Sequence, residues 1–394
     1  MAKLPLYLDY NATTPVAPEV VDAMLPFFMQ HFGNPSSAHH YGAVARQAMA
    51  VAREQVAALV GARPDEILFT GSATEANNLA LLGVARLAAP HRRHLIISAI
   101  EHPAVTGPAR HLQGTGWAVT VLPVDEYGLV DPQDLKDALR PDTALVSVMH
   151  ANNEVGTIQP LAEIAALAHA NGSLFHTDAA QSAGKIAVDV GSLGVDLLTL
   201  AGHKLYTPKG IGALYVRTGT PIAPAGLFGG GQERGLRSGT ENVPYLVALG
   251  TAARLAQETL VEYSARVRAL RDSLHARLAA AVPGLELNGH PERRLPNTLH
   301  VSFPGVSGSV LLAEAAEEVA ASVGSACHGD QGPASDVLTA MRLGSRRALG
   351  AVRLSLGRDT TAADIGRAAD ALTGAFHRLN GAGGAVPDNG RKLE

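Results

Sequence analysis

Six residues with reactive or hydrogen-bonding side chains come at or shortly after the ends of β-rich runs. They are His102, Asn153, Asp178, Gln181, His203 and Lys204. The carboxyl ends of parallel strands meet at one edge of a sheet, where ligands of open α/β sheets bind. A lysine held in such a cleft can act as a nucleophile, and an aspartate ending an apolar strand needs a cationic partner. Each residue alone also suits a structural role, but together they indicate one site.

A turn of small residues, 71-GSATEANN-78, opens a predicted helix directly after the strand-like run 67-ILFT-70. Backbone N–H groups at such a helix start can bind a phosphate, and an ordinary capped helix is the alternative. No Gly-Lys-Ser/Thr follows, so a nucleoside triphosphate site is not expected. Pyridoxal phosphate (PLP) requires a lysine, an acid, an aromatic cover and a phosphate anchor. The combination therefore favours a PLP enzyme, and no metal is expected.

Cys327 is the only cysteine among 394 residues, and it lies in the Gly-rich stretch 322-SVGSACHGDQGPAS-335. An unreactive thiol usually lies in an apolar run, because it behaves as a small hydrophobic group. A thiol on a polar, glycine-rich loop instead suits a reactive group, and a buried inert thiol is the alternative. A single cysteine also excludes an intramolecular disulfide and favours a reducing cytoplasm.

The elements that would position these residues alternate between strand and helix. The strand-like runs are 67–70, 94–98, 117–124, 144–149, 173–178, 196–201 and 211–216. This alternation predicts a mostly parallel sheet covered on both faces. Residues 202–210 are too few for a parallel crossover, so the run 211–216 should be antiparallel to its predecessor. We therefore expect an α/β fold with a mixed seven-stranded sheet.

The C-terminal part predicts a smaller α+β domain. Residues 246–282 have a helical composition over a length that allows more than one helix, and they could bridge two domains. Further strands are expected at 298–303, 319–324 and 351–356, and further helices at 308–317 and 362–379. We place a large domain at 16–258, a small domain at 1–15 and 259–380, and a flexible tail at 381–394.

Composition excludes several classes of protein. The net charge is −4, 46% of residues are hydrophobic and 17% are charged, with no long block of one sign. This balance argues against binding to nucleic acid or to a membrane surface as the main function. No apolar run approaches the roughly 18 residues of a membrane span, and the N-terminal residues lack the apolar core of a signal peptide.

The sequence resembles the NifS-type cysteine desulfurases and the related selenocysteine lyases, which belong to the class V aminotransferase group of PLP enzymes. The resemblance runs from residue 7 to about residue 380. Its motifs are 7-YLDYNATTP-15, 33-GNPSSAHHYG-42, 70-TGSATEANN-78, 101-EHPAV-105, 152-NNEVGTIQP-160, 176-HTDAAQSAGK-185, 202-GHKLYTPKGIGALYV-216, 229-GGGQERGLRSGTEN-242, 324-GSACHG-329 and 352-VRLSLGR-358. It implies the fold type I architecture of PLP-dependent transferases and a homodimer.

The resemblance also implies a role for each site residue. Lys204 would hold PLP as a Schiff base, and Asp178 would pair with the pyridine nitrogen. Gln181 would bond the ring hydroxyl, and His102 would stack on the ring and help to move protons. The phosphate would be bound by Ala73, Thr74 and His203, and by Thr240 across the subunit interface. The substrate carboxylate would be held by Asn34, Asn153 and Arg353, with Asn153 also beside the cofactor.

The implied reaction converts L-cysteine to L-alanine and places the sulfur on Cys327 as a persulfide, for delivery to an acceptor protein. A selenocysteine lyase that releases selenium and L-alanine is the alternative. An aminotransferase and a PLP-binding protein without turnover are further alternatives. Many relatives have a serine where this chain has Ala201, so one hydrogen bond to the phosphate would be missing.

Overall fold

The computed structural model describes residues 4–324 and 335–381. Its larger part is built on a seven-stranded sheet with the strand order β2-β8-β7-β6-β5-β3-β4. The strands are β2 (Ile67–Thr70), β3 (His94–Ser98), β4 (Ala118–Leu122), β5 (Thr143–Ser147), β6 (Leu174–Asp178), β7 (Leu197–Ala201) and β8 (Gly212–Val216). β8 pairs antiparallel with both β2 and β7, and the remaining pairs are parallel. The predicted mixed sheet and the reversed last strand are confirmed.

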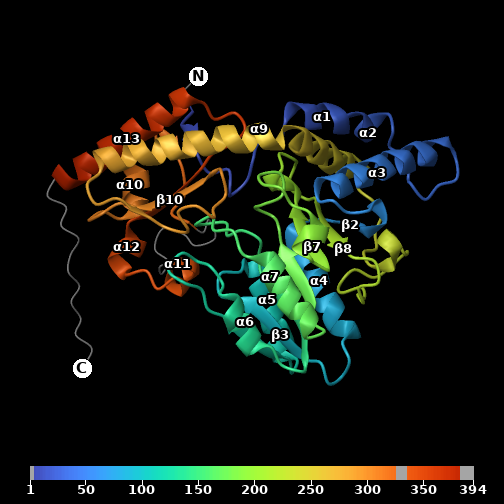
Figure 1. Cartoon of the computed structure of the whole chain (residues 1–394). Helices are drawn as coiled ribbons and strands as arrows, with labels where there is room; N and C mark the ends of the chain where they lie inside the picture. Colours follow the sequence, from blue (N-terminus) through green and yellow to red (C-terminus); the bar gives the residue numbers. More distant parts are fainter. Residues whose placement is uncertain (1–3, 325–334, 382–394) are drawn as a thin grey trace.

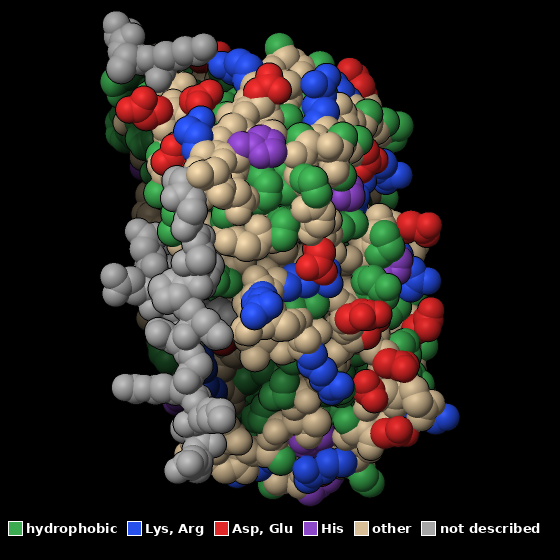
Figure 2. All heavy atoms as spheres, turned by 90° about the vertical axis from the view of Figure 1, so that its left-hand side faces the viewer, with side chains coloured by type: hydrophobic (Ala, Val, Ile, Leu, Met, Phe, Trp, Pro, Cys, Tyr) green, Lys and Arg blue, Asp and Glu red, His purple; other side chains and the backbone are tan. Residues whose placement is uncertain are grey.

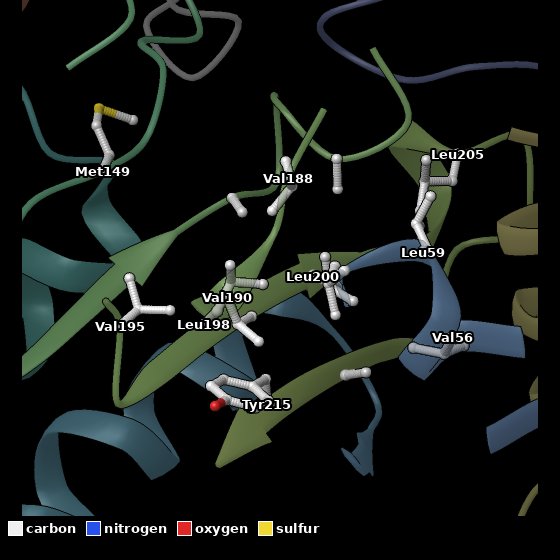
Figure 3. Close-up of a cluster of buried hydrophobic side chains, with 14 of the residues drawn as sticks. Val56, Leu59, Met149, Val188, Val190, Val195, Leu198, Leu200, Leu205 and Tyr215 are labelled. Atoms are coloured by element: carbon white, nitrogen blue, oxygen red, sulfur yellow. The ribbon is translucent and has the colours of Figure 1, made fainter. Parts of the chain in front are cut away.

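Helices cover both faces of this sheet, because successive side chains of a strand point to opposite faces and both sets are apolar. Leu68, Leu145 and Leu197 pack with α4 (Ala73–Leu87) and α5 (Pro103–Gly114) on one face. Phe69, Val146 and Leu198 belong to the core on the other face, part of which Figure 3 shows. The helices contributing to this second core include α1 (Pro18–Met24), α3 (His40–Leu59), α6 (Pro132–Ala138), α7 (Leu161–Ala170) and α8 (Val190–Leu193).

The smaller part has its own buried core around a three-stranded sheet of order β12-β10-β9. Its elements are β9 (Glu286–Leu287), β10 (Thr298–Ser302), β12 (Ala351–Ser355), α10 (Gly308–Glu314), α12 (Ser345–Leu349) and α13 (Ala362–Gly381). The strand β1 (Leu6–Tyr7) pairs in parallel with β11 (Val319–Ala320), so residues far apart in the sequence lie side by side here. Acidic and basic side chains are interspersed on the face shown in Figure 2.

One continuous helix, α9 (Val243–Ala281), runs along the top of the molecule in Figure 1 and connects the two parts. It packs against α3 at one end and against α13 at the other. The expectation of more than one helix in this segment is wrong, because the only proline, Pro244, lies in the first turn and the helix continues through Gly250. The helices α2 (Pro26–Met29) and α11 (Asp336–Ala340) are short.

The domain boundaries inferred from sequence remain a prediction, and the tail from 382 lies outside the described residues.

No helix among the described residues combines the length and the hydropathy needed to cross a membrane.

Candidate active site

A cavity of about 600 Å³ lies at the carboxyl ends of the central strands, between the two parts of the molecule. Nine residues that were predicted from sequence line it: Ala73, Thr74, His102, Asn153, Asp178, Gln181, His203, Lys204 and Arg353. This is the edge at which ligands bind in α/β sheets. The fold therefore brings most of the predicted site residues together, although they span 280 positions from residue 73 to residue 353.

Lys204 ends a short 3₁₀ turn, Gly202–Lys204, that directly follows β7. Its side chain is half-buried, and its Nζ donates hydrogen bonds to the backbone carbonyls of Asn11 and Ala12, the latter at 2.6 Å. The turn is so compact that a Cβ at position 202 would lie only 2.5 Å from the Thr207 hydroxyl oxygen, which is why glycine is needed there. The amine is therefore presented to the cavity from a rigid strand end.

Asp178 is the last residue of β6 and is only 5% exposed. Its Oδ2 accepts a hydrogen bond from Asn77 Nδ2 at 2.7 Å, and its Oδ1 accepts from the Ala180 backbone N–H at 2.9 Å. Two neutral donors support the charge but do not neutralise it. A cation arriving in the cavity, such as a protonated pyridine nitrogen, would complete the pairing that a buried carboxylate requires.

His102 is the N-cap residue of α5, and its Nδ1 accepts a hydrogen bond from the Ala104 backbone N–H at 3.1 Å. A neutral ring in this position carries its proton on Nε2. Burial lowers the pKa of His102, against an opposing effect of the Asp178 charge. The ring is therefore neutral at physiological pH and can accept or relay a proton.

The N-terminus of α4 forms the end of the cavity that suits a phosphate. Ser72 caps this helix by accepting a hydrogen bond from the Glu75 N–H at 3.1 Å, and the next two residues line the cavity. Strand β8 passes so closely beneath that a Cβ at Gly212 would lie 2.9 Å from the Ala73 nitrogen. The positive end of the helix dipole at Ala73 and Thr74 favours an anion here.

His203 lies in the turn between β7 and Lys204. Its Nδ1 is 3.2 Å from the Thr13 hydroxyl. Burial, reinforced by the charge of Lys204, lowers the pKa of His203 to about 4. The ring is thus a neutral hydrogen-bonding group beside the phosphate end. Ala201, the residue that replaces the serine of many relatives, also lines the cavity and offers no hydroxyl.

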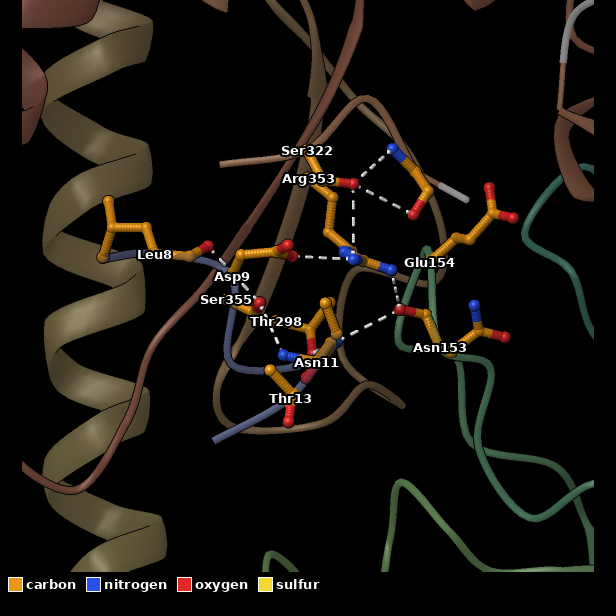
Figure 4. A network of polar contacts seen from close by, with 12 residues as sticks. Leu8, Asp9, Asn11, Thr13, Asn153, Glu154, Thr298, Ser322, Arg353 and Ser355 are labelled. Carbon is orange, nitrogen blue, oxygen red and sulfur yellow. Dashed lines mark hydrogen bonds and ion pairs between the residues drawn. The ribbon is translucent and has the colours of Figure 1, made fainter. Parts of the chain in front are cut away.

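Arg353 lies on β12 and is only 2% exposed. Figure 4 shows its polar contacts. Its Nη2 forms an ion pair with Asp9 Oδ1 at 2.7 Å, and its Nη1 donates to the Asn153 carbonyl at 3.0 Å. The Nε atom is buried and has no partner in the described part of the chain. A substrate carboxylate would therefore meet a guanidinium that is already paired, and its binding by Arg353 remains a prediction.

Two predicted residues lie away from the cavity. Asn34 is exposed, and its Oδ1 accepts a hydrogen bond from the Ser36 N–H at 2.9 Å. Thr240 is also exposed, in the loop before α9. Within one chain neither residue reaches the site, so their proposed contacts depend on a second subunit.

Cys327 lies outside the described residues, as does the rest of the segment 325–334. The flanks of this segment are described, and they border the site. Asp336 and Val337 line the cavity, and the Ser335 hydroxyl donates to Glu154 Oε2 at 2.5 Å. Asp336, which lines the cavity, thus comes nine positions after the cysteine in the sequence.

Sequence reasoning missed four buried residues around the cavity: Asn11, Asn77, Glu101 and Lys185. Asn11 and Lys185 are connected with Gln181 and Lys204 through hydrogen bonds. The quoted motifs contained all four residues. Their burial and their hydrogen bonds depend on partners distant in the sequence, so nothing local to these residues indicated a role in the site.

Glu101 is buried beside the cavity. Its Oε1 accepts hydrogen bonds from the Ser98 hydroxyl at 2.6 Å and the Met149 N–H at 2.7 Å, whereas its Oε2 has no partner among the described residues. Burial raises the pKa of Glu101 to about 8. The carboxyl group is therefore protonated at neutral pH in the folded chain, whereas it ionises near pH 4.5 when the chain unfolds.

This raised pKa predicts a loss of stability as the pH rises. The unfolded chain releases the proton first, so the contribution of Glu101 is complete below about pH 4.5 and is lost as the pH rises toward 8. The variant Glu101→Gln should resist this loss, with a free energy of unfolding that gains on the order of 3 kcal/mol over wild type between pH 5 and pH 8. Urea denaturation of the PLP-free proteins would measure it.

The matched control is Glu163→Gln, at an exposed position on α7. It should follow the wild type at both pH values. Parallel pH dependences for wild type and Glu101→Gln would contradict the raised pKa.

The residues present fit PLP. The cavity is lined by a helix N-terminus for a phosphate, by a buried carboxylate for a pyridine nitrogen, and by an amine in the turn that follows β7. Asn77 Oδ1 and Glu101 Oε2 line the cavity as buried oxygens without a partner in residues 4–324 and 335–381. Such atoms need a hydrogen-bond partner, and a bound group or water supplies one.

Comparison with known proteins places the chain in a family. Residues 6–367 match the sequence model of the family described as "Aminotransferase class-V". The chain belongs to the aminotransferase class-V family. This class-V chain is 45% identical to "Cysteine desulfurase IscS" of Dictyoglomus turgidum, over 96% of each protein. It is 44% identical to "Cysteine desulfurase" of Homo sapiens, over 92% of this chain and 79% of that protein.

Solved structures agree with this placement. The class-V chain superposes on a "NIFS-LIKE PROTEIN" with a TM-score of 0.88 at 38% identity, over 96% of this chain and 100% of the other. It superposes on the structure "SspA in complex with cysteine" with a TM-score of 0.79 at 38% identity, over 89% and 98% of the two chains. The NifS-type resemblance and the fold class inferred from sequence are confirmed.

Proposed function

We propose that the chain is a PLP-dependent cysteine desulfurase that converts L-cysteine to L-alanine and transfers the sulfur to Cys327. The observation that carries this proposal is the placement of Lys204 and Asp178 at the ends of adjacent strands, facing one cavity. The names of the relatives at 44–45% identity support the same activity. PLP itself is proposed from the fit of the cavity and from the family.

Bound PLP supplies a conjugated ring that spreads the negative charge left when the substrate Cα loses its proton. The chain's own residues do the rest. Lys204 carries the amine that removes this proton, and the neutral His102 ring beside it assists the transfer. Asp178 would stabilise positive charge on the pyridine nitrogen. The helix N-terminus at Ala73 and Thr74, with His203, fixes the phosphate and so the orientation of the whole group.

Sulfur transfer needs a thiolate that approaches the substrate sulfur and then leaves the site. The Cys327 thiolate attacks that sulfur, so an S–S bond forms and the substrate C–S bond breaks. The electron pair of the broken bond remains on the substrate carbon, which gains protons and becomes alanine. Cys327 is left as a persulfide. No external oxidant or reductant is needed, because the substrate carbon is reduced as the sulfur is transferred.

Mass spectrometry after a pulse of L-cysteine tests this proposal. The peptide that contains Cys327 should gain the mass of one sulfur atom, which dithiothreitol removes, and one alanine should form for each persulfide. The variant Cys327→Ala should form neither product from L-cysteine. Full alanine production by this variant from L-cysteine would reject a role for the thiol.

A selenocysteine lyase is the second candidate. The runs 227-LFGGGQER-234 and 321-ASVGSACHGDQGPAS-335 resemble that branch of the family. Within the first run, Glu233 is buried and forms an ion pair with Arg53 at 2.6 Å, so it has a structural role. The two candidates predict different outcomes for Cys327→Ala: a desulfurase loses activity on L-cysteine, whereas a lyase keeps activity on L-selenocysteine.

A homodimer is proposed as the working form. The exposed large apolar residues include a group before and at the start of α3: Leu25, Phe28, Met29, Phe32 and Tyr41. Exposed patches of this kind mark interaction surfaces. Asn34 lies within the same segment, and the ion pair Arg53–Glu233 joins α3 to the loop that leads to Thr240. A second copy on this surface would bring both residues toward a site. Sedimentation equilibrium would then give twice the chain mass.

The acceptor of the sulfur is proposed to be another protein, since a persulfide must be passed on for the thiol to act again. A cytoplasmic location is proposed as well. A reducing compartment keeps a lone thiol available for this chemistry.

A further inference from the structure

Lys185 is buried beside the cavity, and its side chain is part of the hydrogen-bond network around Asn11. It is only 4% exposed and follows Gly184, whose φ of +73° and close contact with Leu205 leave no room for a side chain. Its Nζ donates hydrogen bonds to Gln181 Oε1 at 2.8 Å and to Asn11 Oδ1 at 3.1 Å. Both acceptors are neutral amide oxygens.

These two bonds determine which way each amide faces. A lysine amine in this position acts as a donor, so it requires the oxygen of each amide rather than the nitrogen. With its Oε1 held by Lys185, Gln181 has its NH₂ group on the opposite side. That group donates to the Asn11 carbonyl at 2.9 Å. Gln181 also lines the cavity.

The same Asn11 carbonyl accepts a hydrogen bond from Lys204 Nζ. Lys185, Gln181, Asn11 and Lys204 are therefore linked by an unbroken set of hydrogen bonds. Asn11 Oδ1 is held from a second side by Asn297 Nδ2 at 3.0 Å. The network consequently holds its amides in one orientation.

Retaining a lysine here is costly, because burial lowers the pKa of its amine and the charges of Lys204 and Arg353 lower it further. A methionine of similar length would fill the same space without this penalty. Buried polar groups that are retained despite such a cost often serve specificity of conformation.

We propose that Lys185 is a positioning residue that holds Gln181 Oε1 and thereby fixes the orientation of the Gln181 NH₂ group. One hydrogen of that group donates to the Asn11 carbonyl, and the other is turned toward the cavity, where it donates to the ring oxygen of PLP. This inference rests on the proposed function, because it requires PLP in the cavity. It assigns to Lys185 an action through Gln181 and no contact with the substrate.

A double-mutant cycle on PLP binding tests it. PLP-free proteins are titrated with PLP, and the dissociation constant is obtained from the visible absorbance. Lys185→Met should bind PLP about tenfold more weakly than wild type, the loss of one buried hydrogen bond. In a Gln181→Ala background, Lys185→Met should cause no further weakening. Lys136→Met, at an exposed position on α6, is the control and should bind as wild type does.

An equal weakening in both backgrounds would mean that Lys185 only supports the fold, and no weakening in either would also overturn the inference. The variant Gln181→Glu keeps the bond to Lys185 but has no NH₂ group, so it should bind PLP as weakly as Gln181→Ala does, even if Lys185→Met fails to fold. Binding by Gln181→Glu as tight as wild type would overturn the inference. A wild-type protein that does not bind PLP would overturn the proposed function instead, and this inference with it.

Discussion

Lys204→Ala is expected to abolish covalent attachment of PLP. After incubation with PLP and reduction with borohydride, the wild-type peptide that contains Lys204 should carry the label, and the variant should carry none. The absorbance band at about 420 nm that is typical of lysine-bound PLP should be missing as well. Alanine formation from L-cysteine should fall by at least about 1,000-fold, because the variant loses both the attachment point and the base.

The control is Lys209→Ala, at an exposed lysine five residues further along the same loop. It should retain the label and the band. A label on another lysine, or a Lys204→Ala protein with wild-type turnover, would refute the assignment of the site.

Asp178→Asn is expected to have the second largest effect. The substitution preserves size, and an amide oxygen at Oδ1 can still accept from the Ala180 N–H. It removes the negative charge at the pyridine end of the cavity, so positive charge there is no longer stabilised. PLP should still attach to Lys204, but turnover should fall by on the order of 100-fold or more. Absorbance would report the attachment, and alanine formation would report the turnover.

Asp196→Asn provides the matched control. Asp196 is equally buried, at 5% exposure, but it lies at the opposite edge of the sheet, where it contacts His169 at 2.8 Å and Arg217 at 3.5 Å. Its replacement should lower the unfolding temperature and leave the turnover of the folded protein unchanged. Equal losses of turnover in the two variants would show that Asp178 acts only through stability.

The sequence predicted the strands that carry the site and the sheet edge at which it lies, because the signals for both are local. The apolar runs marked the strands, and the short connection 202–210 required β8 to be antiparallel. Those two facts placed Asp178 and Lys204 at one edge of the sheet, and the structure brings them to one cavity.

The remaining features depend on contacts between residues that are far apart in the sequence. Asn11 bonds Thr298 across 287 positions, and no pattern near residue 11 announces that partner. The protonated state of Glu101 arises from burial by elements that the sequence does not relate to it. The ion pair of Arg353 with Asp9 spans 344 positions. The resemblance assigned this guanidinium to a substrate carboxylate, and nothing near residue 353 indicates that Asp9 is its partner.

The placement of the N-terminal segment has a consequence for biosynthesis. Asn11 donates its backbone N–H to Ser355 Oγ at 2.9 Å, and Ser355 donates its N–H to the Leu8 carbonyl at 2.7 Å. Synthesis proceeds from the N-terminal side, so Asn11 leaves the ribosome 344 positions before the Ser355 that holds it. Contacts over such long separations form slowly. The carbonyls of Asn11 and Ala12 that hold Lys204 are fixed only once these contacts form. Nascent or prematurely terminated chains therefore contain the reactive lysine without the surroundings that make it an enzyme.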